Sequence, residues 1–201
     1  LNEHIDYIAL HMYVGNYDDN YYDFVATPLV MDQRTQIVRG QILKQHAERP
    51  IHIAWDEYNV WYRARGGADA VGTHALEEHY DLEDCLVIAG MLNVFIKNAD
   101  IVKMANMAQL VNVIAPIFAD TDKMFKQTIY YPLEMYANNM HGESLDVFVD
   151  CGKYDTSENF SHGDNEVTAT LKDVPYLDVT AALDGDELTV CVVNRHLDKA
   201  I

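Results

Sequence analysis

The sequence predicts an α/β region followed by an all-β region, and two observations indicate this order. Up to about residue 142, near-continuous apolar runs alternate with segments of helical periodicity, as in parallel strands covered by helices on both faces. Beyond that point, short runs alternate apolar and polar residues around turn signals, as antiparallel strands do. We therefore predict two domains, 1–142 and 143–201.

The first predicted strand, 5–14 (IDYIALHMYV), is a short run of apolar, β-branched and aromatic residues. A polar, tyrosine-rich loop separates it from a helix over 28–49, whose apolar residues are interspersed with Lys, Arg and Gln. Pro50 ends that helix. The second strand, 51–57 (IHIAWDE), is again nearly continuous in apolar residues, so we expect both of its faces to be covered.

A long loop rich in glycine and charge follows over 58–80. The next helix, 81–96, keeps its apolar residues at 3.6-residue spacing and begins at Asp81, a residue type that caps helix N-termini. A third, shorter strand covers 100–105 (DIVKMA), and a last helix covers 130–140. Strand and helix thus alternate three times, which predicts a parallel α/β sheet.

Three short alternating runs define the predicted β region: EVTATL (166–171), YLDVTAAL (176–183) and ELTVCVV (187–193). Asp184-Gly185 lies between the last two, and Asp-Gly is a strong signal for a β-hairpin turn. Acidic residues dominate the charge between 143 and 173. We expect an antiparallel domain whose solvent face is acidic.

The charge composition narrows the function. The 201 residues include 14 Lys and Arg against 32 Asp and Glu, which gives a formal net charge of −18. Nucleic acids and anionic membranes bind clustered Lys and Arg, and the sequence contains no such cluster, so neither is an expected partner. The longest apolar stretch, 85–96, is too short to span a bilayer.

The cysteines indicate the compartment. They are odd in number, widely spaced and form no CxxC motif: Cys85, Cys151 and Cys191. This usage is typical of a reduced, cytosol-like protein with incidental thiols, so we predict a cytoplasmic location.

The densest group of side chains that could take part in catalysis or substrate binding is 55–62 (WDEYNVWY). It begins at the C-terminal end of a predicted parallel strand. Loops that leave such strand ends converge around one mouth in TIM barrels and open α/β sheets. Aromatic rings stack on sugars, and a carboxylate attacks or stabilises an oxocarbenium-like centre. The alternative is structural: an acidic strand end that pairs with a core Arg or caps the next turn.

Two further groups lie at predicted strand ends. His11 and Tyr13 have the same parity, so on a strand they point to one side, where they would bond a carboxylate or a sugar hydroxyl; Asn16 follows them. The alternative is a satisfied core His and Tyr. The other group follows the third strand: Asn106, Gln109 and Asn112. These amides could instead cap helices or hydrogen-bond loops.

Several motifs are absent. The stretch from His74 to His79 looks like a zinc helix, but it matches neither HExxH nor HxxEH, so we predict no metal site. The sequence contains no GxSxG, no GxGxxG after a strand and no GxxxxGK[ST]. Serine-hydrolase and nucleotide-binding functions lose support accordingly, and no cofactor is expected.

With these residues in place, the sequence resembles the family 51 glycoside hydrolases, the intracellular α-L-arabinofuranosidases. Residues 56–62 (DEYNVWY) are similar to the family's DEWNVWY segment, and 11–16 (HMYVGN) are similar to its HxYxGN strand end. The one departure is Tyr58 where Trp is usual. The likeness continues in order through 81–84 with Asn93, 104–116, 130–134, 174–178 and 193–195.

That resemblance implies the C-terminal part of a (β/α)8 TIM barrel, about units six to eight, followed by an incomplete antiparallel β-sandwich. It also implies a retaining double displacement that releases terminal α-L-arabinofuranosyl residues from arabinan or arabinoxylan oligosaccharides. Glu57 matches the catalytic nucleophile. His11 and Tyr13 match residues that orient the nucleophile and line the sugar subsite, and Trp61 and Gln109 match substrate contacts.

The family's acid/base glutamate lies in a Gly-Asn-Glu motif that the sequence does not contain. The Asn-Glu pairs are Asn2-Glu3, before the first strand, and Asn165-Glu166, in the β region, so neither is carried over. A (β/α)8 barrel takes about 250 residues. We therefore expect a truncated chain that carries the nucleophile, lacks the acid/base and is inactive alone.

Two alternatives stay open. One is a non-catalytic carbohydrate-binding fragment, and the other is a related hydrolase that acts on xylan or glucan. The sequence leaves open whether the full-length enzyme forms a homo-oligomer.

Overall fold

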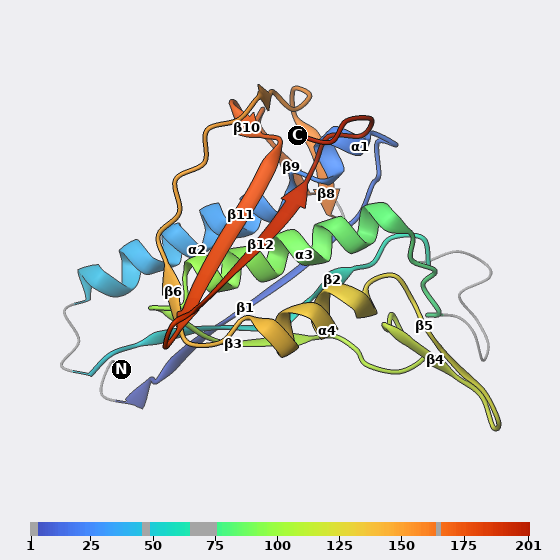
Figure 1. Ribbon diagram of the computed structural model, residues 1–201, viewed down its shortest axis with the longest axis horizontal. Helices are drawn as coiled ribbons and strands as arrows, with labels where there is room; N and C mark the ends of the chain where they lie inside the picture. Colours follow the sequence, from blue (N-terminus) through green and yellow to red (C-terminus); the bar gives the residue numbers. More distant parts are fainter. Residues whose placement is uncertain (1–3, 46–48, 65–75, 164–165) are drawn as a thin grey trace.

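The computed structural model describes residues 4–45, 49–64, 76–163 and 166–201. Its main elements form three layers (Figure 1): a parallel sheet, helices packed on that sheet, and an antiparallel hairpin on the far side of the helices. The predicted order, an α/β region followed by antiparallel strands, is confirmed.

Three strands form the parallel sheet in the order β1-β2-β3: β1 is Tyr7–Val14, β2 is His52–Val60 and β3 is Val102–Met107. Because they run in one direction, their carboxyl ends meet at one edge. The expected end of the second strand at Glu57 is wrong. Asn59 and Val60 still pair with β1 and are fully buried, so the loop begins three residues later than predicted, at Trp61.

The described residues form four helices: α1 (Tyr21–Phe24), α2 (Thr27–Lys44), α3 (Leu82–Lys97) and α4 (Tyr130–Asn139). Helix α3 begins where predicted, because the Asp81 side chain accepts two backbone N–H groups of its first turn and completes a capping box with Asp84. Helix α2 ends at Lys44 rather than at residue 49, and 46–48 lie outside the described residues. The single turn of α1 was not predicted. Within the described part of the chain, no helix is both long and apolar enough to cross a membrane.

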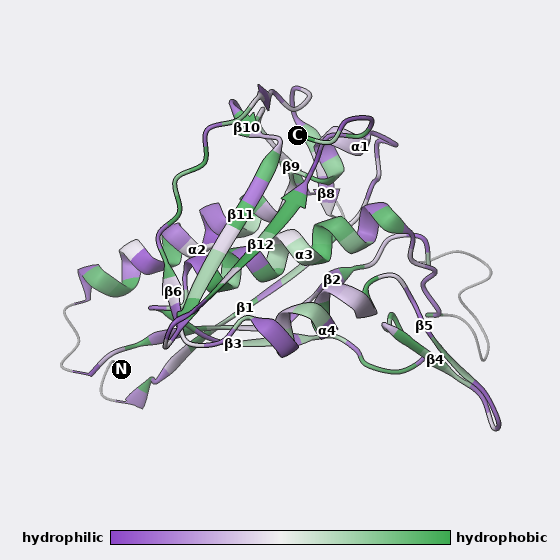
Figure 2. Ribbon diagram, in the orientation of Figure 1, coloured by the Kyte–Doolittle hydropathy of each residue, from purple (hydrophilic) through white to green (hydrophobic). Residues whose placement is uncertain are grey.

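Helix α3 lies at the centre of the hydrophobic core. It contacts β2 and β3 on one side and the hairpin of β11 (Leu177–Asp184) and β12 (Glu187–Asn194) on the other. Its side chains Val87, Ile88 and Met91 are fully buried. Figure 2 shows a more hydrophobic ribbon for α3 than for α2, which alternates between hydrophobic and hydrophilic residues. A helix covered on two sides needs apolar residues over most of its surface, and α3 has them.

The β11–β12 hairpin forms where Asp184-Gly185 predicted it. Asp184 pairs with Glu187, which leaves Gly185 and Asp186 as the two turn residues. Gly185 has a φ of +59°, a conformation that favours glycine. A third strand, β6 (Glu143–Leu145), pairs with β11 and gives the sheet order β12-β11-β6.

Three short antiparallel pairs complete the strands of the described residues: β4 (Ile117–Ala119) with β5 (Met124–Lys126), β7 (Lys153–Tyr154) with β10 (Val174–Pro175), and β8 (Phe160–Gly163) with β9 (Glu166–Thr168). The strand predicted over 166–171 is therefore too long. Leu171 leaves the ladder to bond the backbone and hydroxyl of Thr156, and its side chain is buried. The β4–β5 hairpin was not predicted.

A buried ion pair connects β11 to the end of the hairpin, and its two residues also bond the helical layer. Arg195 is 1% exposed, and its Nη2 lies 2.7 Å from Oδ2 of Asp178 while its Nε donates to the carbonyl of Val25. Lys97 of α3 also pairs with Asp178, and Asn93 donates to its carbonyl. Removing one partner of a buried pair costs about 3–5 kcal/mol, so the pair of Arg195 and Asp178 stabilises the hairpin, while Lys97 and Asn93 attach β11 to α3.

Candidate active site

A β-bulge in β2 brings two adjacent carboxylates to the same partner. Leu10 of β1 pairs with Trp55, but the next residue, His11, pairs with Glu57, so Asp56 is the extra residue on β2. The register of β2 against β3 shifts over the same stretch. The bulge lies near the carboxyl end of the strand, where the sequence predicted the reacting groups.

The bulge also decides which side chains face the helices. The rings of Trp55 and Tyr58 both contact Phe95 of α3, with centroid distances of 6.4 and 4.9 Å. Residues three apart on a regular strand point to opposite faces, so both rings reach Phe95 because one residue is inserted between them. The side chains of Asp56 and Glu57 remain 37% and 45% exposed, on the face of the sheet that α3 does not cover.

Two side chains of β1 reach these carboxylates. The Tyr13 hydroxyl donates to Oε2 of Glu57 at 2.9 Å. His11 lies between the two acids, with Nε2 3.0 Å from Oδ1 of Asp56 and Nδ1 3.6 Å from Oε2 of Glu57. The His11 side chain is 52% exposed, so the alternative of a buried core histidine is wrong. The expected contact of this pair with a carboxylate is present.

Trp61 lies beside this group. Its backbone N–H donates to the carbonyl of Val14 at 2.9 Å, which fixes the chain as it leaves β2. Its ring meets the Tyr13 ring edge-on, with centroids 5.5 Å apart and planes at 72°. An aromatic surface therefore stands next to the tyrosine that bonds Glu57.

Gln109 is exposed in the loop that follows β3, at the same end of the sheet as Glu57. The loop is held by Asn59 of β2, whose side chain is fully buried and donates to the carbonyls of Ala108 and Ile114 at 2.8 and 2.6 Å. The backbone N–H of Gln109 donates to the same Ile114 carbonyl. Asn59 was not identified as a site residue from the sequence, although it lies inside the motif that carries the family resemblance.

The other predicted amides serve the loops. Asn16 donates to Glu83 at the start of α3 and accepts from the backbone of Asn20. Asn112 exchanges two hydrogen bonds with the backbone of Ala119, so for Asn112 the loop alternative is confirmed. Asn106 is exposed on β3.

A buried glutamate fixes the chain just after Trp61. Glu78 is fully buried, and its carboxylate accepts the backbone N–H groups of Tyr62, Arg63 and Ala64 at 3.3, 2.9 and 2.7 Å. Glu78 lies in the stretch that resembles a zinc helix, and its role has no local sequence signal because the N–H groups that it accepts lie 14–16 positions away. His74, at the start of that stretch, lies outside the described residues. Among those that are described, no group of three or more His, Cys, Asp or Glu is arranged to hold a metal.

Arg63 extends this support to helix α3. Its guanidinium lies 2.9 Å from Asp84 and 3.0 Å from Asp81. Burial raises the pKa of the Asp84 carboxyl to about 7, against the lowering effect of Arg63 and of the Asp81 backbone. The cap of α3 therefore contains a carboxyl group whose pKa lies near neutral pH.

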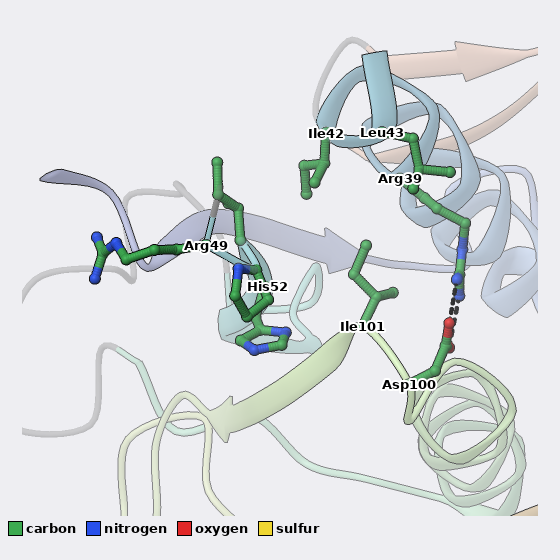
Figure 3. Close-up of a pocket in the computed structure, with 9 residues that line it drawn as sticks. Arg39, Ile42, Leu43, Arg49, His52, Asp100 and Ile101 are labelled. Carbon is green, nitrogen blue, oxygen red and sulfur yellow. Dashed lines mark hydrogen bonds and ion pairs between the residues drawn. The ribbon is translucent and has the colours of Figure 1, made fainter. Parts of the chain in front are cut away.

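A cavity of about 420 Å³ lies at the opposite end of the sheet. Figure 3 shows it between the end of α2 and the start of β2 and β3, with Arg39 paired to Asp100 across its rim. His52 and Ile101 also line it. Because these residues lie at the amino ends of the strands, the cavity is separate from Glu57.

Comparison with known proteins gives a family match that includes the candidate site residues on β2 and on the loop after β3. The family described as "Alpha-L-arabinofuranosidase C-terminal domain" matches residues 56–194. The intracellular exo-α-(1→5)-L-arabinofuranosidase of Halalkalibacterium halodurans is 35% identical over 99% of this chain. The corresponding enzyme 1 of Bacillus subtilis is 33% identical over 98%. The chain spans 40% and 39% of the lengths of these two relatives.

Solved structures agree with the sequence relatives. The α-L-arabinofuranosidase of Thermotoga maritima, in its arabinose complex, has a TM-score of 0.81 and 32% identity. The match covers 96% of this chain and 39% of that protein. The family 51 enzyme of Thermotoga petrophila gives the same values. With the family match over more than half of its length, the chain belongs to the family 51 α-L-arabinofuranosidases and corresponds to their C-terminal portion.

Proposed function

We propose that this chain is the C-terminal part of a retaining α-L-arabinofuranosidase and that Glu57 is its nucleophile. The observation that carries the proposal is the hydrogen bond from Tyr13 to Glu57, with His11 beside it, at the carboxyl end of a parallel strand. The family membership gives the reaction class. The geometry supplies a half-exposed carboxylate that a substrate can reach.

In this proposal the two oxygens of Glu57 have different tasks. Tyr13 and His11 both lie against Oε2, which leaves Oε1 to attack the anomeric carbon as the glycosidic bond breaks. The product of that step is an arabinosyl ester of Glu57, with Oε2 as its carbonyl oxygen. Water then attacks the anomeric carbon and gives its proton to the second carboxyl group, the ester bond breaks, and the electron pair returns to the Glu57 carboxylate.

The leaving oxygen needs a proton from a second carboxyl group about 5–5.5 Å from the nucleophile. Asp56 is already paired with His11 and adjoins Glu57 in the chain, so it does not stand across a bound sugar. Glu166 is engaged with Arg34 in the β8–β9 hairpin. We therefore assign the acid/base to the part of the protein upstream of Leu1, as the greater length of the relatives supports.

The same proposal covers the fold of the whole enzyme. Residues 1–142 are a partial (β/α)8 barrel with β1, β2 and β3 as strands six to eight, and 143–201 are part of a β-sandwich. The parallel order and the helices on one face support this, as does the position of Glu57 on the other face. In a closed barrel that open face is the interior, and the strand ends form the mouth.

The substrate class follows from the relatives and from the site. Two relatives are named exo-α-(1→5)-L-arabinofuranosidases, and we propose that the full enzyme removes terminal arabinofuranosyl residues from arabinan or arabinoxylan oligosaccharides in the cytoplasm. Trp61 presents an aromatic surface beside Tyr13, and Gln109 an amide from the neighbouring loop. These two residues are the proposed sugar contacts of this chain, together with His11 and Tyr13.

Glu57→Ala in the full-length enzyme tests the proposal. Hydrolysis of an aryl α-L-arabinofuranoside should be nearly abolished, and azide should restore turnover by forming the arabinosyl azide of inverted configuration. Glu134→Gln, which removes an exposed carboxylate on α4, serves as the control and should keep normal activity. Retained hydrolysis in Glu57→Ala would reject the assignment. Binding of arabinose oligosaccharides without turnover by the wild-type enzyme would favour a carbohydrate-binding function instead.

A further inference from the structure

The β8–β9 hairpin belongs to the β region, yet it lies against the end of β1, at the proposed site (Figure 1). The carbonyl of Val14 faces β2, where it accepts the N–H of Trp61. Carbonyls alternate in direction along a strand, so the backbone groups of Tyr13 and Gly15 face the other edge of β1. Within the described parallel sheet, that edge has no strand partner. There the N–H of Gly15 donates to the carbonyl of His162 at 3.1 Å, so the hairpin meets β1 just beyond Tyr13.

The next residue of the hairpin, Gly163, packs against the backbone of Tyr13. A Cβ atom added to Gly163 would lie 3.3 Å from the carbonyl oxygen of Tyr13 and 3.2 Å from Oε2 of Glu166, which is tighter than most contacts of such an atom. Arg34 holds that Glu166 oxygen at 2.6 Å. We infer that Gly163 is a positioning residue, whose missing side chain lets the hairpin hold Tyr13 in register with Glu57; this rests on the proposed function.

The hairpin is fixed well enough to act as a stop for β1. The backbone N–H of Ser161 donates to Oδ2 of Asp18, in the loop after β1, at 2.7 Å. Phe160 is fully buried in the hydrophobic core, and the ion pair of Glu166 ties β9 to α2. A hairpin held by these contacts cannot move back freely to admit a larger residue at position 163. A side chain there would therefore displace the end of β1.

Such a displacement matters because the hydroxyl of Tyr13 bonds Glu57 at 2.9 Å. Hydrogen bonds between two oxygens have lengths of about 2.5–3.0 Å, so a shift of a few tenths of an ångström takes this one out of range. The orientation of the Glu57 carboxylate for attack would then be lost in part. The proposed sugar contacts on the loops after β2 and β3 do not touch the hairpin in any described contact, so substrate binding should change less than the chemical step.

Gly163→Ala in the full-length enzyme tests the inference. With an aryl α-L-arabinofuranoside, kcat should fall by about three- to tenfold, because the bond from Tyr13 to Glu57 is displaced rather than removed. In a Tyr13→Phe background, the same substitution should change kcat by less than about twofold, since no hydroxyl is left to misplace. A residue with a merely structural role would lower kcat by the same factor in both backgrounds.

Gly40→Ala is the matched control, because it also adds a methyl group to a glycine, and outside its own stretch of helix nothing lies within 4 Å of the added atom. It should keep the wild-type kcat. Two results would overturn the inference: a kcat of Gly163→Ala equal to that of the control, or an equal loss in the wild-type and Tyr13→Phe backgrounds.

If Gly163→Ala does not fold, Glu166→Gln takes its place, because it weakens the tie to Arg34 at a half-exposed position. Here kcat should fall by about two- to fivefold, again only while the Tyr13 hydroxyl is present, and the same two results would overturn the inference. Labelling of Glu57 in the wild-type enzyme by a mechanism-based inactivator, read by mass spectrometry, tests the proposed function separately.

Discussion

The phenolic oxygen of Tyr13 lies 2.9 Å from Oε2 of Glu57, so a hydrogen bond joins the carboxyl ends of β1 and β2. It connects residues 44 positions apart in the chain. The Tyr13 ring also packs against the Trp61 ring in an edge-to-face arrangement. The proposed nucleophile Glu57 is thus oriented by Tyr13 of the neighbouring strand. Tyr13 in turn packs against Trp61, in the loop that follows β2.

Tyr13→Phe should lower kcat of the full-length enzyme by about 10- to 100-fold, because a hydrogen bond to a charged group is worth about 1.5–3 kcal/mol. The ring and its contact with Trp61 remain, so stability should change little. Steady-state kinetics with an aryl arabinofuranoside and a thermal melt measure both effects. Tyr7→Phe, at the start of β1 where the ring is 44% exposed, is the control. Equal kcat values for the two variants would contradict the role of Tyr13.

Asn59→Ala should destabilise the protein by about 1–3 kcal/mol, since it removes the amide that donates to the Ala108 carbonyl and leaves the Ile114 carbonyl with the backbone N–H of Gln109 alone. Because those carbonyls belong to the loop that carries Gln109, KM should rise as well. The comparison is with Asn139→Ala, whose side chain bonds its own helix at the surface. Unfolding midpoints and KM measure the two effects. A wild-type KM in Asn59→Ala, with a raised KM in Gln109→Ala, would show that Asn59 does not position this loop.

Much of the fold could be predicted from the sequence, where a local pattern determines the outcome. The apolar runs of β1 and β2 indicated buried parallel strands, Asp81 marked the start of α3, and Asp184-Gly185 marked the hairpin. Each signal depends on residues a few positions apart. The contact between the hairpin and α3 is different, because it depends on Arg195 and Asp178 being buried by the rest of the fold.

The candidate site was predicted in part. The sequence pattern predicted that His11, Tyr13 and Glu57 lie together, and they do. Residues two apart on a strand point to the same side, and parallel strands end at one edge, so local pattern was enough for this prediction. The bulge at Asp56 gave no sequence signal: the string from Trp55 to Tyr58 reads as a regular strand, and its pairing with both neighbours decides which residue is inserted. Asn59 was likewise missed, since a buried amide is recognised only once the loop that it bonds is in place.

Asp84 should make stability depend on pH. Burial raises the pKa of its carboxyl in the folded protein to about 7, above the ordinary value of 3.8, so the folded state binds the proton more tightly. This contribution to stability is present in full below about pH 4 and is lost as the pH rises through about 7. The Asp84→Asn variant of the full-length enzyme should therefore lose less thermal stability than wild type between pH 4.5 and 7.5. A difference between the two melting temperatures that stays constant over this range would contradict the assignment.

The isolated 201-residue chain should not hydrolyse an aryl arabinofuranoside, although it carries Glu57. On the proposed function the acid/base lies upstream of Leu1. The described parallel sheet also has three strands, so β1 and β3 each leave one edge without a strand partner in that sheet. Mixing the chain with the separately produced upstream region should restore turnover, because that region supplies both the missing carboxyl group and the neighbours of the two edges. The control is the same mixture with the Glu57→Ala chain, which should stay inactive. Turnover by the chain alone would show that the second carboxyl lies within these residues.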